Sequence, residues 1–203
     1  TSVVYLLLKG DIPLIVTAQR VAAGTDNYLL LCIPFFFLAG ELMNAGGIME
    51  RLLGFSRSLV GHIPGGLGHV NVVSSMLFSG ISGSAVSDAS GLGMLEIELM
   101  RRSGYDDGFS GAITAASATI GPVIPPSIPF VIYGGITGVS VGKLFLGGII
   151  PGILMGLFLM LFVYRIASKR GYERSVWASF SEVLREVYRS ITVLILPVMI
   201  LGG

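Results

Sequence analysis

The sequence predicts an all-α, polytopic membrane protein. Of its 203 residues, 53% are hydrophobic and only 12% are charged, and the mean hydropathy is +0.83. A soluble domain carries about one quarter charged residues. Two of the hydrophobic segments contain runs of Gly, Ser and Pro that weaken or break an α-helix. Because lipid cannot satisfy a free backbone, we expect these breaks to be buried in protein or to line a watery cavity.

The composition also excludes several classes of protein. A net charge of +1 argues against a nucleic-acid partner, and the single cysteine, Cys32, allows no intrachain disulfide. No segment has the spacing of a phosphate-binding loop, so we expect no ATP hydrolysis. We also expect no enzyme activity and no cofactor. The chain begins and ends inside apolar runs, which indicates a fragment of a longer protein.

The sequence of residues 1–69 predicts scaffold transmembrane and amphipathic helices. Residues 1–8 have the composition of the end of a spanning helix, 12–23 form a helix too short to span, and 27–45 are long enough to span. Apolar and charged residues alternate at helical spacing over 46–64, which predicts an amphipathic helix at the inner membrane interface.

Residues 139–175 predict a spanning helix with a basic end. The segment 144–164 contains no charged residue, and Gly148, Gly152 and Gly156 repeat every fourth position in it. Such a row of small residues lets a neighbouring helix approach closely.

The end of the chain continues with an amphipathic connecting helix over 176–190 and the truncated start of the next transmembrane helix over 191–203. Residues 165–190 contain six Lys and Arg, which places this side in the cytoplasm. Glu96 and Glu98 lie near Arg101 and Arg102, so we expect both to form solvated ion pairs on that side; the alternative is that they carry protons.

The segment 70–104 predicts a re-entrant helical hairpin. The 31 residues from 70 to 100 are too many for one helix and too few for two complete spans. Two arms of about 14 residues would each reach about 20 Å, past the middle of a hydrocarbon core about 30 Å thick. A hairpin also leaves the basic residues before and after it on the same side of the membrane.

The tip of this hairpin is a candidate cation site. The carbonyl end of its first arm attracts a cation and the amide end of its second arm attracts an anion. Asp88 either caps the second arm or lies near the bound cation. The candidate residues at the tip are Ser82, Gly83, Ser84, Ala85, Ser87 and Asp88.

The segment 105–138 predicts a broken transmembrane helix. Four prolines lie within the eight residues 122–129, and proline prevents helical hydrogen bonding of the carbonyls before it. Freed carbonyls and hydroxyls are neutral oxygen ligands that suit an alkali cation, the only kind of metal ion we expect. The candidate residues at the break are Thr119, Gly121, Pro122, Val123, Pro125, Pro126 and Ser127.

Two other classes are compatible with parts of the sequence. Residues 80–83 (GISG) match the short motif around the nucleophile of rhomboid intramembrane proteases, but a serine nucleophile needs a base, and both histidines precede Ser82. The second class is a membrane subunit without transport activity of its own. Two adjacent backbone breaks would have no function in such a subunit.

The motifs are similar to those of one transporter family. Residues 76–90 (MLFSGISGSAVSDAS), 104–106 (GYD) and 115–129 (AASATIGPVIPPSIP) resemble the large membrane (M) subunit of tripartite ATP-independent periplasmic (TRAP) transporters. Residues 33–43 (IPFFFLAGELM) and 138–152 (GVSVGKLFLGGIIPG) support the resemblance, which covers nearly the whole chain in order.

The resemblance implies a sodium-coupled secondary transporter of the ion-transporter superfamily type. Its transport core would move by an elevator mechanism, and this chain would hold the first of two inverted repeats. Its partners would be a small membrane subunit (Q-type, separate or fused) and a periplasmic substrate-binding protein. It would import an organic acid, such as a C4-dicarboxylate or sialic acid, across the bacterial inner membrane. The tip and the break would form one sodium site and one wall of the substrate cavity. A stand-alone sodium–dicarboxylate carrier is the alternative.

Overall fold

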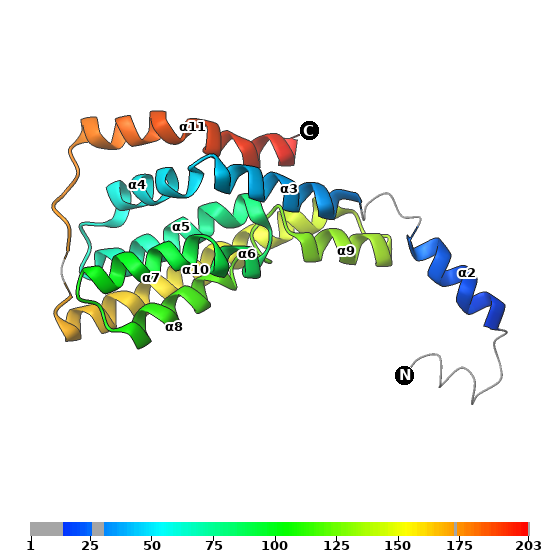
Figure 1. Cartoon of the computed structure of the whole chain (residues 1–203), viewed down its shortest axis with the longest axis horizontal. Helices are drawn as coiled ribbons and strands as arrows, with labels where there is room; N and C mark the ends of the chain where they lie inside the picture. Colours follow the sequence, from blue (N-terminus) through cyan, green and yellow to red (C-terminus); the bar gives the residue numbers. More distant parts are fainter. Residues whose placement is uncertain (1–13, 26–30, 173, 203) are drawn as a thin grey trace.

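The computed structural model describes residues 14–25, 31–172 and 174–202, and all regular structure in these ranges is helical (Figure 1). The predicted helix over 1–8 lies outside the described residues. The helices are α2 (Leu14–Thr25), α3 (Cys32–Ala45), α4 (Ile48–Val60), α5 (Gly66–Ser82), α6 (Ala85–Ser90), α7 (Leu92–Arg102), α8 (Asp107–Ala118), α9 (Ile128–Thr137), α10 (Val141–Arg170) and α11 (Phe180–Gly202).

Helix α5 is the centre of the bundle. It packs against α4 on one side and against α7, α8 and α10 on the others, while α11 covers α4 (Figure 1). After Gly83 the chain turns back, and α7 runs along α5 to form a helical hairpin with the short α6 near its tip. Helix α2 lies apart from this bundle in Figure 1.

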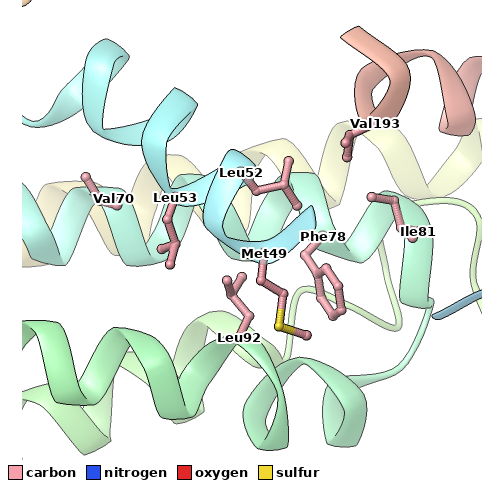
Figure 2. Close-up of a cluster of buried hydrophobic side chains, with 8 residues drawn as sticks. All are labelled: Met49, Leu52, Leu53, Val70, Phe78, Ile81, Leu92 and Val193. Atoms are coloured by element: carbon pink, nitrogen blue, oxygen red, sulfur yellow. The ribbon is translucent and has the colours of Figure 1, made fainter. Parts of the chain in front are cut away.

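The apolar core between α4 and α5 follows from the sequence of α4. Met49, Leu52 and Leu53 have the i, i+3, i+4 spacing of one helix face, and all three are buried. Figure 2 shows these side chains directed at partners from α5, α7 and α11, namely Val70, Phe78, Ile81, Leu92 and Val193. Burying each such side chain contributes about 1.5–3 kcal/mol, so this cluster fixes α4 on the hairpin.

Helix α10 is the one helix in the described part of the chain that is long and apolar enough to cross a membrane. Its small-residue face packs as predicted, because Gly148, Gly152 and Gly156 are buried in the bundle. A Cβ atom at Gly156 would lie 2.2 Å from the sulfur of Met76 on α5, and one at Gly152 would lie 2.4 Å from Ile124. A larger residue at either position would therefore have to displace the neighbouring side chain.

The end of the chain differs from the prediction in one respect. We predicted an amphipathic helix over 176–190 and a separate helix from 191, whereas α11 is a single helix from Phe180 to Gly202. No glycine or proline interrupts the chain near residue 190, and Ser190 is buried against α4, where its hydroxyl donates to the Arg51 carbonyl at 3.2 Å. The helix begins where Ser179 and Glu182 bond each other's backbone amides, as in a capping box.

Candidate cation and substrate site

The hairpin tip is a left-handed turn followed by a new helix start. Helix α5 ends at Gly83, whose backbone is left-handed (φ 57°, ψ 16°) and whose N–H donates to the Ser79 carbonyl. Ser84 is extended, and its hydroxyl accepts from the Ser87 amide, which makes Ser84 the N-cap of α6. The Ser84 amide in turn donates to Ser82 Oγ at 3.4 Å. The polar groups of the tip thus hold the turn in place.

The second interruption lies between α8 and α9. Helix α8 ends at Ala118, and residues 119–127 form a series of turns and bends before α9 begins at Ile128. Ser127 caps α9 by accepting from the Phe130 amide at 3.3 Å, and its hydroxyl donates to the Pro122 carbonyl at 2.6 Å. This fully buried side chain therefore links the two ends of the break and caps the next helix.

The two interruptions pack directly against each other. The Ile128 amide donates to the Gly83 carbonyl at 3.4 Å. A Cβ atom on Gly83 would lie 2.7 Å from the Pro126 carbonyl oxygen, so no side chain fits there. On the other side, a Cβ atom on Gly121 would lie 3.3 Å from the Ala85 nitrogen. Two segments about 40 residues apart in sequence therefore meet backbone to backbone through a pair of glycines.

The predicted site residues fall into three groups in the structure. The first group lies in the contact itself: Gly83, Ser84, Ala85, Gly121, Pro126 and Ser127. Ser82, Ser87 and Pro122 support it through the hydrogen bonds described above. Pro125 is buried in the break, whereas the Val123 carbonyl lies against Gly148 of α10. Thr119 is exposed and bonds back to the Ala116 carbonyl at 2.6 Å, so it is not directed into the contact.

Asp88 does not cap the second arm, which corrects one of the two roles considered for it. Ser84 caps α6 and Gly91 precedes α7, and no described residue donates a hydrogen bond of good geometry to either Asp88 oxygen. The side chain is buried and faces Ser75 on the interior face of α5. A serine is a better N-cap here because it stands one residue before the first helical turn.

The prediction for Glu96 was wrong, whereas Glu98 behaves as expected. Glu98 accepts from Arg102 at 2.8 Å on the exposed face of α7. Glu96 is only 2% exposed, because it falls between Leu92 and Met100 at four-residue spacing on the buried face of the same helix. That spacing was readable in the sequence. The prediction relied instead on how close Glu96 is to Arg101 and Arg102 in sequence, although the arginines lie on a different face of the helix.

Sequence reasoning also missed a buried polar network between α5 and α8. The Asn71 side-chain amide donates to Thr114 at 2.7 Å, and the Ser117 hydroxyl donates to the Asn71 oxygen at 2.7 Å. The Ser75 hydroxyl continues the chain to Ser117 at 3.1 Å. Asn71, Ser74 and Ser75 share one face of α5, and this polar face at helical spacing was the available signal.

The protease alternative has no support in the geometry. The Ser82 hydroxyl accepts from the Ser84 amide at the tip. His69, the histidine nearer to Ser82 in sequence, is buried on the same helix, about 20 Å along its axis. His62 stacks on Trp177 at 3.8 Å between ring centres. Neither histidine can serve Ser82 as a base.

A cavity of about 740 Å³ lies at the other end of the bundle, away from the paired interruptions. Arg57 of α4, Arg185 of α11 and Trp177 line it, together with the end of α7. None of the predicted site residues borders it. The predicted cation site is thus a backbone contact rather than a large cavity.

The fold and this contact define a helical membrane protein in which two interrupted helices meet, the arrangement in which secondary transporters bind ions. Residues 1–203 match the family described as "Tripartite ATP-independent periplasmic transporter, DctM component". The chain therefore belongs to the DctM family of TRAP transporter large permeases, which are integral inner-membrane proteins and not enzymes.

The chain is also similar in sequence to curated relatives over nearly its whole length. It is 49% identical over 202 residues to the sialic acid TRAP transporter large permease protein SiaM of Vibrio cholerae, covering 100% of this chain and 47% of that protein. It is 43% identical over 188 residues to the 2,3-diketo-L-gulonate large permease YiaN of Escherichia coli (93% and 44%). It is 41% identical over 186 residues to the C4-dicarboxylate large permease DctM of Pseudomonas aeruginosa (92% and 44%). The chain spans about half the length of these relatives.

Proposed function

We propose that this chain forms part of the large permease of a transporter that imports an organic acid together with sodium ions. Family membership supports secondary transport of organic acids, since the relatives' names include sialic acid, 2,3-diketo-L-gulonate and C4-dicarboxylates. The observation that carries sodium coupling is the contact between Gly83 and the break at 126–128. In transporters, unwound backbone and the carbonyl ends of half-helices coordinate sodium.

The sodium ligands would come from both interruptions. The carbonyl end of α5 near Gly83 and the turns after α8 supply neutral oxygens, with hydroxyls of Ser84 and Ser127 close by. Neutral carbonyl and hydroxyl oxygens suit a hard alkali cation. The substrate carboxylate would bind beside the ion, where the bound charge attracts it. We leave the identity of the acid open, because the relatives' names cover several.

The hairpin α5–α7 would be re-entrant in the membrane. Helix α5 has 17 residues and a length of about 25 Å, less than a full hydrocarbon core of about 30 Å. The packed unit of α5 to α9 would move as the transport core of an elevator, with α4 and α11 as scaffold arms at the inner interface. A second inverted repeat in the remaining half of the protein would complete the site.

The family also indicates the partners. A small membrane subunit, separate or fused, would hold the scaffold in the bacterial inner membrane, where the large subunit crosses several times. A periplasmic binding protein would deliver the acid. Sodium bound first would fix the contact between the two interruptions and thereby orient the groups that bind the carboxylate. Such coupling is reciprocal, so the substrate would also tighten sodium binding.

Uptake into liposomes tests this proposal. The full-length permease and its small subunit are reconstituted and assayed with and without an inward sodium gradient, and with and without the binding protein outside. Uptake that requires both supports the tripartite transporter. Uptake that needs sodium alone would favour a stand-alone sodium–dicarboxylate carrier. Uptake that is equal with and without sodium would contradict sodium coupling.

A further inference from the structure

A second ionisable group lies inside the hairpin, separate from the paired interruptions. Glu96 of α7 is 2% exposed and faces α5, where the Ser74 hydroxyl contacts its Oε1 atom. Its other oxygen, Oε2, has no hydrogen-bond partner among the described residues. An ionised carboxylate that is buried needs a cation or several donors around it. Glu96 has neither in the described part of the chain.

The hydrogen atoms around Ser74 do not suffice for an ionised Glu96. The Ser74 Oγ atom lies 2.5 Å from the Val70 carbonyl oxygen and also contacts Glu96 Oε1. A serine hydroxyl has one hydrogen to donate, and a carbonyl has none. When Ser74 donates to Val70, as serines inside helices do, the hydrogen in the contact with Glu96 must come from the carboxyl group. An ionised Glu96 would compete with the Val70 carbonyl for the single Ser74 hydrogen, whereas a protonated Glu96 allows both contacts of Ser74 to be hydrogen bonds.

The surrounding charges lead to the same conclusion. Helices α5, α6 and α8 pack along α7, and α4 meets its first turn at Leu92; the charge from these elements that acts on Glu96 is Asp88, another buried carboxyl group. Like charges this close oppose ionisation of both groups. The remaining titratable and charged groups on these elements are Glu50, Arg51 and Arg57 on α4, His69 on α5, Asp106 and Asp107 at the start of α8, and Glu98, Arg101 and Arg102 on α7 itself. Arg101 pairs with Asp107 and Arg102 with Glu98 on the exposed surface, and no arginine in the described part of the chain forms an ion pair with Glu96.

We propose that Glu96 is a proton-binding site of the transport core and that the packed hairpin requires this proton. The carboxyl group, held by Ser74, joins the two arms of the hairpin, α5 and α7. Loss of the proton places an uncompensated charge between the arms and next to Asp88, which separates them. Since the arms carry the tip that meets Pro126, deprotonation also disturbs the contact at the proposed sodium site.

The sign of the pH dependence follows from proton counting. The native hairpin holds a proton that an exposed carboxyl group releases well below neutral pH, so the native state binds more protons than the unfolded state. Stability and transport therefore fall as pH rises. Above the midpoint the protonated fraction of a single site falls about tenfold per pH unit.

The test uses the full-length permease with its small subunit, and it compares Glu96→Gln with the control Glu98→Gln on the exposed face of the same helix. Difference infrared spectra should show a protonated carboxyl band in the wild type and in Glu98→Gln, shifted in deuterium oxide and absent in Glu96→Gln. Sodium-driven uptake of Glu96→Gln should lose the alkaline fall that the wild type and the control show, because glutamine mimics the neutral carboxyl group.

A second variant, Ser74→Ala, removes only the hydroxyl partner and should shift the frequency of the Glu96 band. If Glu96→Gln does not assemble, this shift decides the question. Equal carboxyl bands in the wild type, Glu96→Gln and Ser74→Ala would overturn the proposal. The uptake measurement rests on the proposed transport function, whereas the infrared band does not. Loss of transport in all proteins with the band intact would therefore count against the transport function and leave the proton site standing.

Discussion

The Ile128 amide donates a hydrogen bond to the Gly83 carbonyl, and this 3.4 Å contact joins the end of α5 to the start of α9. It links a hairpin tip to a broken helix, and each alone would leave backbone groups unsatisfied. Burial of unpaired backbone in lipid costs several kcal/mol per group. The two interruptions therefore stabilise each other.

Replacement of Gly83 by alanine should abolish sodium-driven uptake. A left-handed backbone costs about 1–2 kcal/mol for a residue with a Cβ atom, and this Cβ would also lie 2.7 Å from the Pro126 carbonyl oxygen. Gly138→Ala is the matched control, since Gly138 has the same left-handed conformation (φ 74°) and open space around it. Both variants have the backbone strain, but only Gly83→Ala has the close contact with Pro126. Comparison of their uptake in the liposome assay therefore distinguishes the two effects. Equal activity of the two variants would show that the contact with Pro126 is not required.

Ser127→Ala should weaken the broken helix. The substitution removes the N-cap of α9 and the bond to the Pro122 carbonyl, and loss of a cap costs about 0.5–2 kcal/mol. Ser140→Ala offers a control, because Ser140 precedes α10 without a capping hydrogen bond. We expect a lower midpoint of thermal inactivation for Ser127→Ala and no change for Ser140→Ala. An unchanged midpoint in Ser127→Ala would mean that the break is held by packing alone.

Gly148→Val should separate α10 from the break. A Cβ atom at this position would lie 2.4 Å from the Val123 carbonyl oxygen and 2.6 Å from the Phe130 ring. Overpacking of this kind costs about 1–3 kcal/mol. Its neighbour Gly147 has no atom within 4 Å of a Cβ, so Gly147→Val is the control. We expect reduced yield of folded permease for Gly148→Val only, measured by size-exclusion chromatography in detergent.

Much of this arrangement could be predicted from the sequence. The prolines at 122–129 predict the break because proline removes helical hydrogen bonds, and the glycine row in α10 predicts close packing. Both features act locally, within one or two helical turns. The direct contact between Gly83 and residues 126–128 is tertiary, and only the family resemblance suggested it.

The remaining features depend on which face of a helix is buried. Glu96 and Glu98 are two residues apart and look alike in sequence, yet one is buried and the other pairs with Arg102. The network from Asn71 to Ser117 likewise requires the position of α8 against α5. Helix α11 continues through Ser190, where it packs against α4. The change in composition near residue 190 led instead to the prediction of two separate helices.

The most direct test of the paired interruptions as a sodium site is the sodium concentration that gives half-maximal uptake in Gly121→Ala. A Cβ atom here would lie 3.1 Å from the Ala118 carbonyl oxygen and 3.3 Å from the Ala85 nitrogen, closer than an ordinary contact with the tip, whereas Gly111→Ala adds a Cβ into open space on α8. The account predicts about a tenfold higher half-saturating sodium concentration for Gly121→Ala, equal to about 1.4 kcal/mol of lost binding, and the wild-type value for Gly111→Ala. A wild-type sodium dependence in both variants would contradict it.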